Sequence, residues 1–140
     1  MRLRWIVNSL MMILVFGGLF LGVSSLQAVT ANSGEKVENS LVEKLTAQGQ
    51  ADFIVRFTEQ PDLSAAYEMN WAERGEYVVS LLQEAADHSQ GRAKGLLDSA
   101  GMKYQTFFAG NELYVWQGNL DAAGKLAGLP GVESIRETRT

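Results

Sequence analysis

Very few side chains in this chain could perform chemistry. His88 is the only histidine among the 140 residues, and there is no cysteine. His88 stands between Asp87 and Ser89 in a helical pattern, where neighbouring positions do not face each other. A Ser-His-Asp triad needs three converging side chains, and no serine lies in a G-x-S-x-G motif. We therefore interpret His88 as a solvated helix residue.

The other routes to catalysis also lack residues. One histidine without cysteine does not supply a zinc site, and we expect no metal or other cofactor. Gly110-Asn111 suits a hairpin turn rather than a phosphate loop. A glycosidase-type carboxylate pair needs a cleft that one small domain hardly offers. We therefore expect a protein that is not an enzyme.

The first 31 residues have the order of a secretory signal peptide. Arg2 and Arg4 precede an uncharged run from Leu10 to Val23, and small and polar residues follow up to Ala31. This order predicts a secreted or cell-envelope protein, with cleavage after Ala31.

Two alternatives to this cleavage remain open. The small residues Ala28 and Ser25 also suit a signal peptidase. The apolar run extends back to Trp5 if polar residues are tolerated, which approaches the ~20 residues of a spanning helix. An uncleaved membrane anchor is therefore the competing interpretation, and the cleaved signal is favoured.

Charge and length limit the remaining part, residues 32–140. Without Arg2 and Arg4, ten of the 12 basic residues stay, against 16 acidic ones. Such a surface repels phosphate backbones, so we expect no nucleic-acid partner. The length fits a single domain that must rely on its own core, since no disulfide can form.

Apolar periodicity predicts seven elements. Residues 32–50 read as a linker that contains a short amphipathic helix over 37–45, and residues 51–140 read as the domain. Within the domain the expected elements are a strand at 51–58, a helix at 71–100, strands at 103–109 and 112–118, a helix at 119–126 and a strand at 132–137. The apolar stripe of the long helix is expected to run from Val78 and Leu82 to Ser89 and Leu97.

This order of elements predicts the α+β, ferredoxin-like architecture. Two split β-α-β units give a four-stranded antiparallel sheet with two helices on one face. Phe53, Val55 and Phe57 share one face of the first strand and are expected in the core. Val132 and Ile135 do not share parity, so the faces of the last strand stay unassigned.

The other sheet face is left uncovered in this architecture. Glu112, Tyr114 and Trp116 alternate onto it, which makes it a candidate docking surface. Scattered exposed aromatic side chains are also normal on a sheet, so the ordinary interpretation stands beside this one.

Several motifs occur in a fixed order between residues 40 and 137. They are Leu41–Leu45, Ala51–Ala66, Arg74–Leu82, Asn111–Val115 and Leu129–Ile135. In this order and spacing the chain resembles the N-terminal propeptides of secreted subtilisin-like serine proteases (subtilases). The last motif resembles the closing PxVxxI turn and strand of that family.

The resemblance implies both a fold and a role. It implies the ferredoxin-like fold and an intramolecular chaperone that is also a temporary protease inhibitor, monomeric when free. The open sheet face, with Glu112, Tyr114 and Trp116, would pack on two helices of the protease, and Glu112 would cap a helix N-terminus. The C-terminal tail would lie in the substrate cleft like a product, and its residues are Glu137, Thr138, Arg139 and Thr140.

The chain departs from the family pattern at its C-terminal end. We expect no catalytic segments beyond Thr140. Only Arg136 to Thr140 follow Ile135, so the short tail is expected to fill the substrate pockets only in part. Two alternatives stand beside a stand-alone inhibitor or chaperone. One is a truncated or split subtilase precursor, and the other is an exported ferredoxin-like interaction or ligand-binding module.

Overall fold

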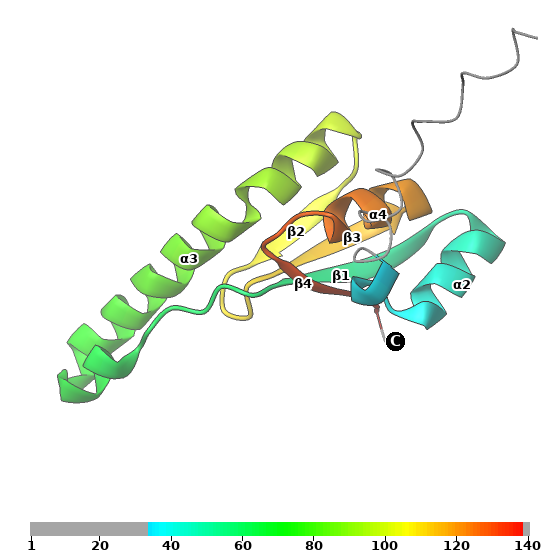
Figure 1. Cartoon of the computed structure of the whole chain (residues 1–140). Coiled ribbons are helices and arrows are strands. Elements are labelled where there is room, and N and C mark those ends of the chain that lie inside the picture. The colour runs from blue at the N-terminus through cyan, green and yellow to red at the C-terminus, as the bar shows by residue number, and fades with distance from the viewer. Residues whose placement is uncertain (1–33, 139–140) are drawn as a thin grey trace, which may run out of the picture.

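A computed structural model describes residues 34–138 of the chain (Figure 1). The predicted signal peptide and its cleavage sites lie outside these residues, as do Arg139 and Thr140. Within residues 34–138, none of the helices combines the length and the apolar character that a membrane crossing requires.

The described residues form a four-stranded sheet with helices. The elements are α2 (Asn39–Gln48), β1 (Ala51–Phe57), η1 (Ser64–Glu68), α3 (Trp71–Ser99), β2 (Tyr104–Phe107), β3 (Glu112–Gly118), α4 (Leu120–Ala127) and β4 (Val132–Glu137). The strand order is β2-β3-β1-β4, and all three neighbouring pairs are antiparallel. The predicted α+β fold of the ferredoxin-like type is confirmed.

Strand β1 lies in the interior of the sheet and carries the centre of the core. Phe53, Val55 and Phe57 are buried, as predicted, while Arg56 between them is exposed. This alternation is typical of an antiparallel sheet with one covered face. The helices meet these side chains in a single hydrophobic cluster through Leu41 and Leu45 of α2, Ala93 and Leu97 of α3, and Ala123 and Leu126 of α4. All three helices therefore cover the same face of the sheet.

The N-terminal helix is part of this domain rather than a linker. It begins at Asn39, later than predicted, because Val37 forms a parallel bridge with Ile135 of β4. The Glu38 amide also donates a hydrogen bond to the Ile135 carbonyl at 2.9 Å. Since Leu41 and Leu45 are buried in the common core, residues 37–48 are integrated with the sheet.

The faces of β4 follow from an irregularity in its pairing with β1. Val132 lies opposite Phe57 and Ile135 lies opposite Val55, and the register shifts between them. Both side chains are buried, whereas Glu133 is exposed. A shift of this kind inserts a residue into one strand, which explains why Val132 and Ile135 do not share parity.

The turn between β2 and β3 is longer than the predicted tight hairpin. Strand β2 ends at Phe107, and residues 108–111 make the connection. Asn111 is in a left-handed conformation with φ 48°, and its amide donates to the Phe108 carbonyl at 3.1 Å. Asparagine tolerates this conformation better than most residues do.

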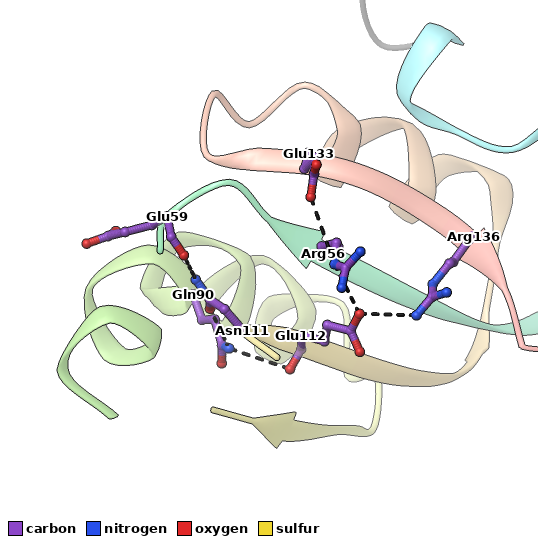
Figure 2. Close-up of polar contacts among 7 residues, drawn as sticks. All are labelled: Arg56, Glu59, Gln90, Asn111, Glu112, Glu133 and Arg136. Atoms are coloured by element: carbon purple, nitrogen blue, oxygen red, sulfur yellow. Dashed lines mark hydrogen bonds and ion pairs between the residues drawn. The ribbon is translucent and has the colours of Figure 1, made fainter. Parts of the chain in front are cut away.

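The side chain of Asn111 ties this turn to the rest of the domain (Figure 2). Its buried Oδ1 accepts hydrogen bonds from Gln90 Nε2 and Ser89 Oγ, each at 3.0 Å. Its Nδ2 donates to the Glu59 carbonyl at 2.9 Å. The turn is therefore fixed to α3 and to the segment after β1.

Helix α3 has the predicted length but only half of the predicted stripe. Asn70 caps it by accepting from the amides of Ala72 and Glu73, both at 3.1 Å. None of residues 71–84 is buried, and the buried positions begin at Ala85. Val78 and Leu82 are half-buried because this part of α3 extends beyond the strands, with η1 against its end (Figure 1).

Candidate functional site

The candidate site is the face of the sheet opposite the three helices, which we call the open face. The strand register places on it Ile54, Arg56, Gln105, Phe107, Glu112, Tyr114, Ser134 and Arg136, and Trp116 follows on β3. Trp116 is 39% exposed and Phe107 is 45% exposed, so apolar surface reaches solvent here. The predicted placement of Glu112, Tyr114 and Trp116 on one face is confirmed.

Glu112 is the centre of an ion-pair network on the open face (Figure 2). Its Oε1 lies 3.3 Å from Arg56 Nε and 3.1 Å from Arg136 Nη2, so β1, β3 and β4 each contribute one side chain. Arg56 Nε also lies 3.9 Å from Glu133 Oε2. Opposite charges on paired strands stabilise a sheet modestly. The carboxylate of Glu112 is thus already compensated by two guanidinium groups.

An aromatic pair lies beside this network. The ring centroids of Tyr114 and Trp116 are 4.8 Å apart and the rings are inclined by 54°, a favourable tilted arrangement. The Tyr114 hydroxyl donates to Asp52 Oδ2 at 2.8 Å, and Asp52 Oδ1 accepts from the Gln117 amide at 2.8 Å. Asp52 therefore holds both the Tyr114 ring, through its hydroxyl, and the backbone directly after Trp116.

The same contact changes the acidity of the tyrosine. The hydrogen bond to Asp52 raises the pKa of the Tyr114 hydroxyl, and desolvation and the charge of Asp52 act in the same direction. Deprotonation would place two negative oxygens against each other. Tyr114 is therefore held as a neutral hydrogen-bond donor.

Glu137, predicted both as the end of the last strand and as the first tail residue, belongs to β4, so the tail begins at Thr138. Glu137 is not a free tail residue, because it pairs with Phe53 at the end of β4 and its carboxylate contacts Lys44 Nζ. Its amide also donates to Glu38 Oε2 at 3.0 Å. Thr138 follows with its Oγ1 at 3.5 Å from the Asp52 carbonyl. The chain therefore leaves the sheet next to the residue that holds the aromatic pair.

His88 does not form a catalytic pair with its neighbour. Its Nδ1 lies 2.8 Å from Glu59 Oε2, a contact that raises the pKa of His88. The Ser89 hydroxyl instead lies 2.7 Å from the Ala85 carbonyl and 3.0 Å from Asn111 Oδ1. Among residues 34–138, no group of three His, Asp or Glu side chains gathers as metal ligands.

Sequence reasoning missed three residues that shape the open face. Arg56 alternates with core residues, so its parity already placed it on this face, but its partner was not foreseen. The face of Arg136 could not be predicted, because the register shift between β1 and β4 breaks the alternation of residues along β4. No pattern signalled that Asp52 would receive both the Tyr114 hydroxyl and the Gln117 amide.

No protein-family model, curated protein or solved structure matches this chain.

Proposed function

We propose that the open face binds a subtilisin-like serine protease, and that the domain acts as an inhibitor of this protease, as its folding chaperone, or as both. One observation carries the proposal. A fixed aromatic pair, Tyr114 and Trp116, lies on an uncovered sheet face beside the point where the tail leaves β4. One partner could then contact the sheet face and an extended peptide segment together, a known mode of protein recognition. The order of motifs that resembles subtilase propeptides supports the same partner.

The aromatic pair would supply most of the binding energy. Tyrosine and tryptophan dominate interface energetics where they are buried by the partner. Glu112 would contribute less than the sequence alone suggests, because Arg56 and Arg136 already neutralise it. A helix N-terminus of the protease would have to share that carboxylate with both arginines. Contact with the substrate cleft would begin at Thr138.

Inhibition tests this proposal first. The protein is titrated into an active subtilisin-type protease while hydrolysis of a small peptide substrate is followed over a prolonged incubation. Trp116→Ala and Tyr114→Ala should each weaken binding by at least about 1–2 kcal/mol. Leu120→Ala is the matched control, because Leu120 is 44% exposed on α4 but lies away from the open face. Equal affinity for all variants would place the interface elsewhere.

Chaperone activity is tested separately by refolding. A denatured subtilisin-type protease is diluted with and without the protein, and the recovered activity is measured after the protein has been digested. Recovery that depends on Trp116, without lasting inhibition, would define a chaperone. If neither inhibition nor recovery occurs, the protease proposal is wrong, and an interaction or ligand-binding module becomes the better interpretation.

A further inference from the structure

A second exposed apolar region lies at the end of α3. It comprises residues 61–84, that is η1 and the first half of α3, and we call it the arm. Only Ala66 is buried within it. Trp71 is 87% exposed and Tyr67 is 80% exposed, more than the other large hydrophobic side chains found exposed in residues 34–138. The arm therefore presents two aromatic side chains almost entirely to solvent.

Polar contacts, rather than a core, hold the arm in one conformation. Arg74 Nε donates to the Ala66 carbonyl at 2.9 Å, and Arg74 Nη2 donates to the Met69 carbonyl at 2.9 Å. Asn70 caps the helix directly beside Trp71. The backbone on both sides of the aromatic residues is thus fixed in advance. Such preorganisation lowers the entropy that binding would otherwise cost.

The arm as a whole is strongly acidic. The arm has five carboxylates, and all are exposed: Asp62, Glu68, Glu73, Glu76 and Glu84. Its only basic residue is Arg74, whose guanidinium is engaged by backbone carbonyls. An anionic membrane would be repelled by this surface, and so would the same arm of a second copy. The charge selects a cationic occupant.

We propose that the arm is a second binding site, and that it takes a cationic segment of a protein partner in which lysine or arginine surrounds an apolar side chain. Trp71 and Tyr67 would contact the apolar side chain and the stems of the basic residues, with a cation–π contribution. The five carboxylates would steer the approach and fix the register. The site uses no residue of the open face and does not depend on the protease proposal.

The test uses the protein purified from cells that express the whole chain, and a helical peptide made of lysine and leucine as the probe. Calorimetric titration should show binding that weakens as salt is added. The same peptide with glutamate in place of lysine should not bind. Trp71→Ser should lower the affinity at least about tenfold, and Glu73→Gln combined with Glu76→Gln should reduce both the affinity and its salt dependence. Circular dichroism confirms that each variant is folded.

Leu120→Ser is the control, because it also replaces an exposed apolar side chain by serine, at a site outside the arm. An equal loss with Leu120→Ser, or no loss with Trp71→Ser, would overturn the proposal. Two other results would overturn the cationic protein segment as the ligand of the arm and indicate a different one. Trp71-dependent binding to phosphatidylglycerol vesicles would indicate a membrane, and Trp71-dependent dimerisation in sedimentation would indicate a second copy.

Discussion

The two halves of α3 form one continuous helix, but core packing stabilises residues 85–99, whereas a cap and local hydrogen bonds stabilise residues 71–84. Residues 85–99 place Ala93 and Leu97 in the core with no exposed surface. Residues 71–84 bury no side chain, and a cap at Asn70 and the contacts of Arg74 fix their end. Burial of apolar side chains contributes far more free energy than a cap or exposed hydrogen bonds. The contribution of α3 to the stability of the domain therefore comes mainly from its second half.

This difference separates two tasks within one element. The second half supports the sheet from behind and so fixes the geometry of the open face. The first half has no core to maintain, so its side chains are available for contacts with other molecules. A cap and local hydrogen bonds are enough to form the first half of the helix, whereas core packing decides how much each half contributes to the free energy of unfolding.

The largest expected effect tests the core itself. Phe57 is 1% exposed on β1, and Phe57→Ala should lower the free energy of unfolding by about 3–5 kcal/mol through lost burial and a cavity. Urea denaturation measures this loss. A transition that barely shifts would show that the core side of β1 is misassigned, and the comparison between the two halves would lose its basis.

A direct comparison of the halves comes next. Leu97→Ala should cost about 2–5 kcal/mol, because Leu97 is fully buried. Leu82→Ala should cost less than about 1 kcal/mol, because Leu82 is only partly buried and more solvent already surrounds it. Both values come from the same denaturation experiment. Similar losses would mean that the arm shares the main core after all.

Glycines in the two halves give a smaller and sharper test. Apart from the backbone of the helix itself and the adjoining residues, neither Gly75 nor Gly91 has another group within 4 Å of the place where a Cβ would stand. Alanine should therefore stabilise the helix by up to about 1 kcal/mol at each position. Hydrogen exchange should show Gly91→Ala raising protection throughout the domain. Gly75→Ala should raise protection mainly in residues 71–84, since this half can open locally.

The smallest effect concerns pH at the junction of the helix with the segment after β1. The hydrogen bond to Glu59 raises the pKa of His88, with the charge of Glu59 acting in the same direction. The stabilisation by protonated His88 is therefore fully present below its unfolded pKa of about 6.5 and is lost as pH rises through the folded value. The stability difference between the wild type and His88→Gln should be largest below about pH 6.5 and should shrink as the pH rises above it. A constant difference would contradict this.

Much of the fold was predictable because its signals are local. Alternation in β1 gave the core face, Asn119 caps α4 through the Ala122 amide at 2.8 Å, and the bounds of α3 agree within one residue. The bridge between Val37 and Ile135 was not predictable, since it joins distant parts of the chain. The burial of Gln90 and Asn111 was not predictable either. A polar residue such as Gln90 in a helix is normally expected on the solvent-exposed face.

The candidate site shows the same division between local and distant information. Strand parity alone was enough to place Tyr114 and Trp116 together. The compensation of Glu112 depends on Arg136, whose position follows from a register shift between β1 and β4. Glu137 was predicted both as the last strand residue and as the first tail residue, and its pairing with Phe53 and its contact with Lys44 place it in β4. The alternation of residues along one strand therefore shows which face a side chain lies on, but not which side chains of other strands it pairs with.

The interior position of β1 also has a consequence for how the protein is made. Both neighbours of β1 come from much later in the chain, β3 at residues 112–118 and β4 at residues 132–137. During synthesis, Phe53 and Phe57 emerge long before any strand can pair with them, and non-local pairing of this kind is slow. The nascent chain thus carries unpaired apolar surface that invites aggregation. Completion of the sheet has to wait until its last strand has emerged from the ribosome.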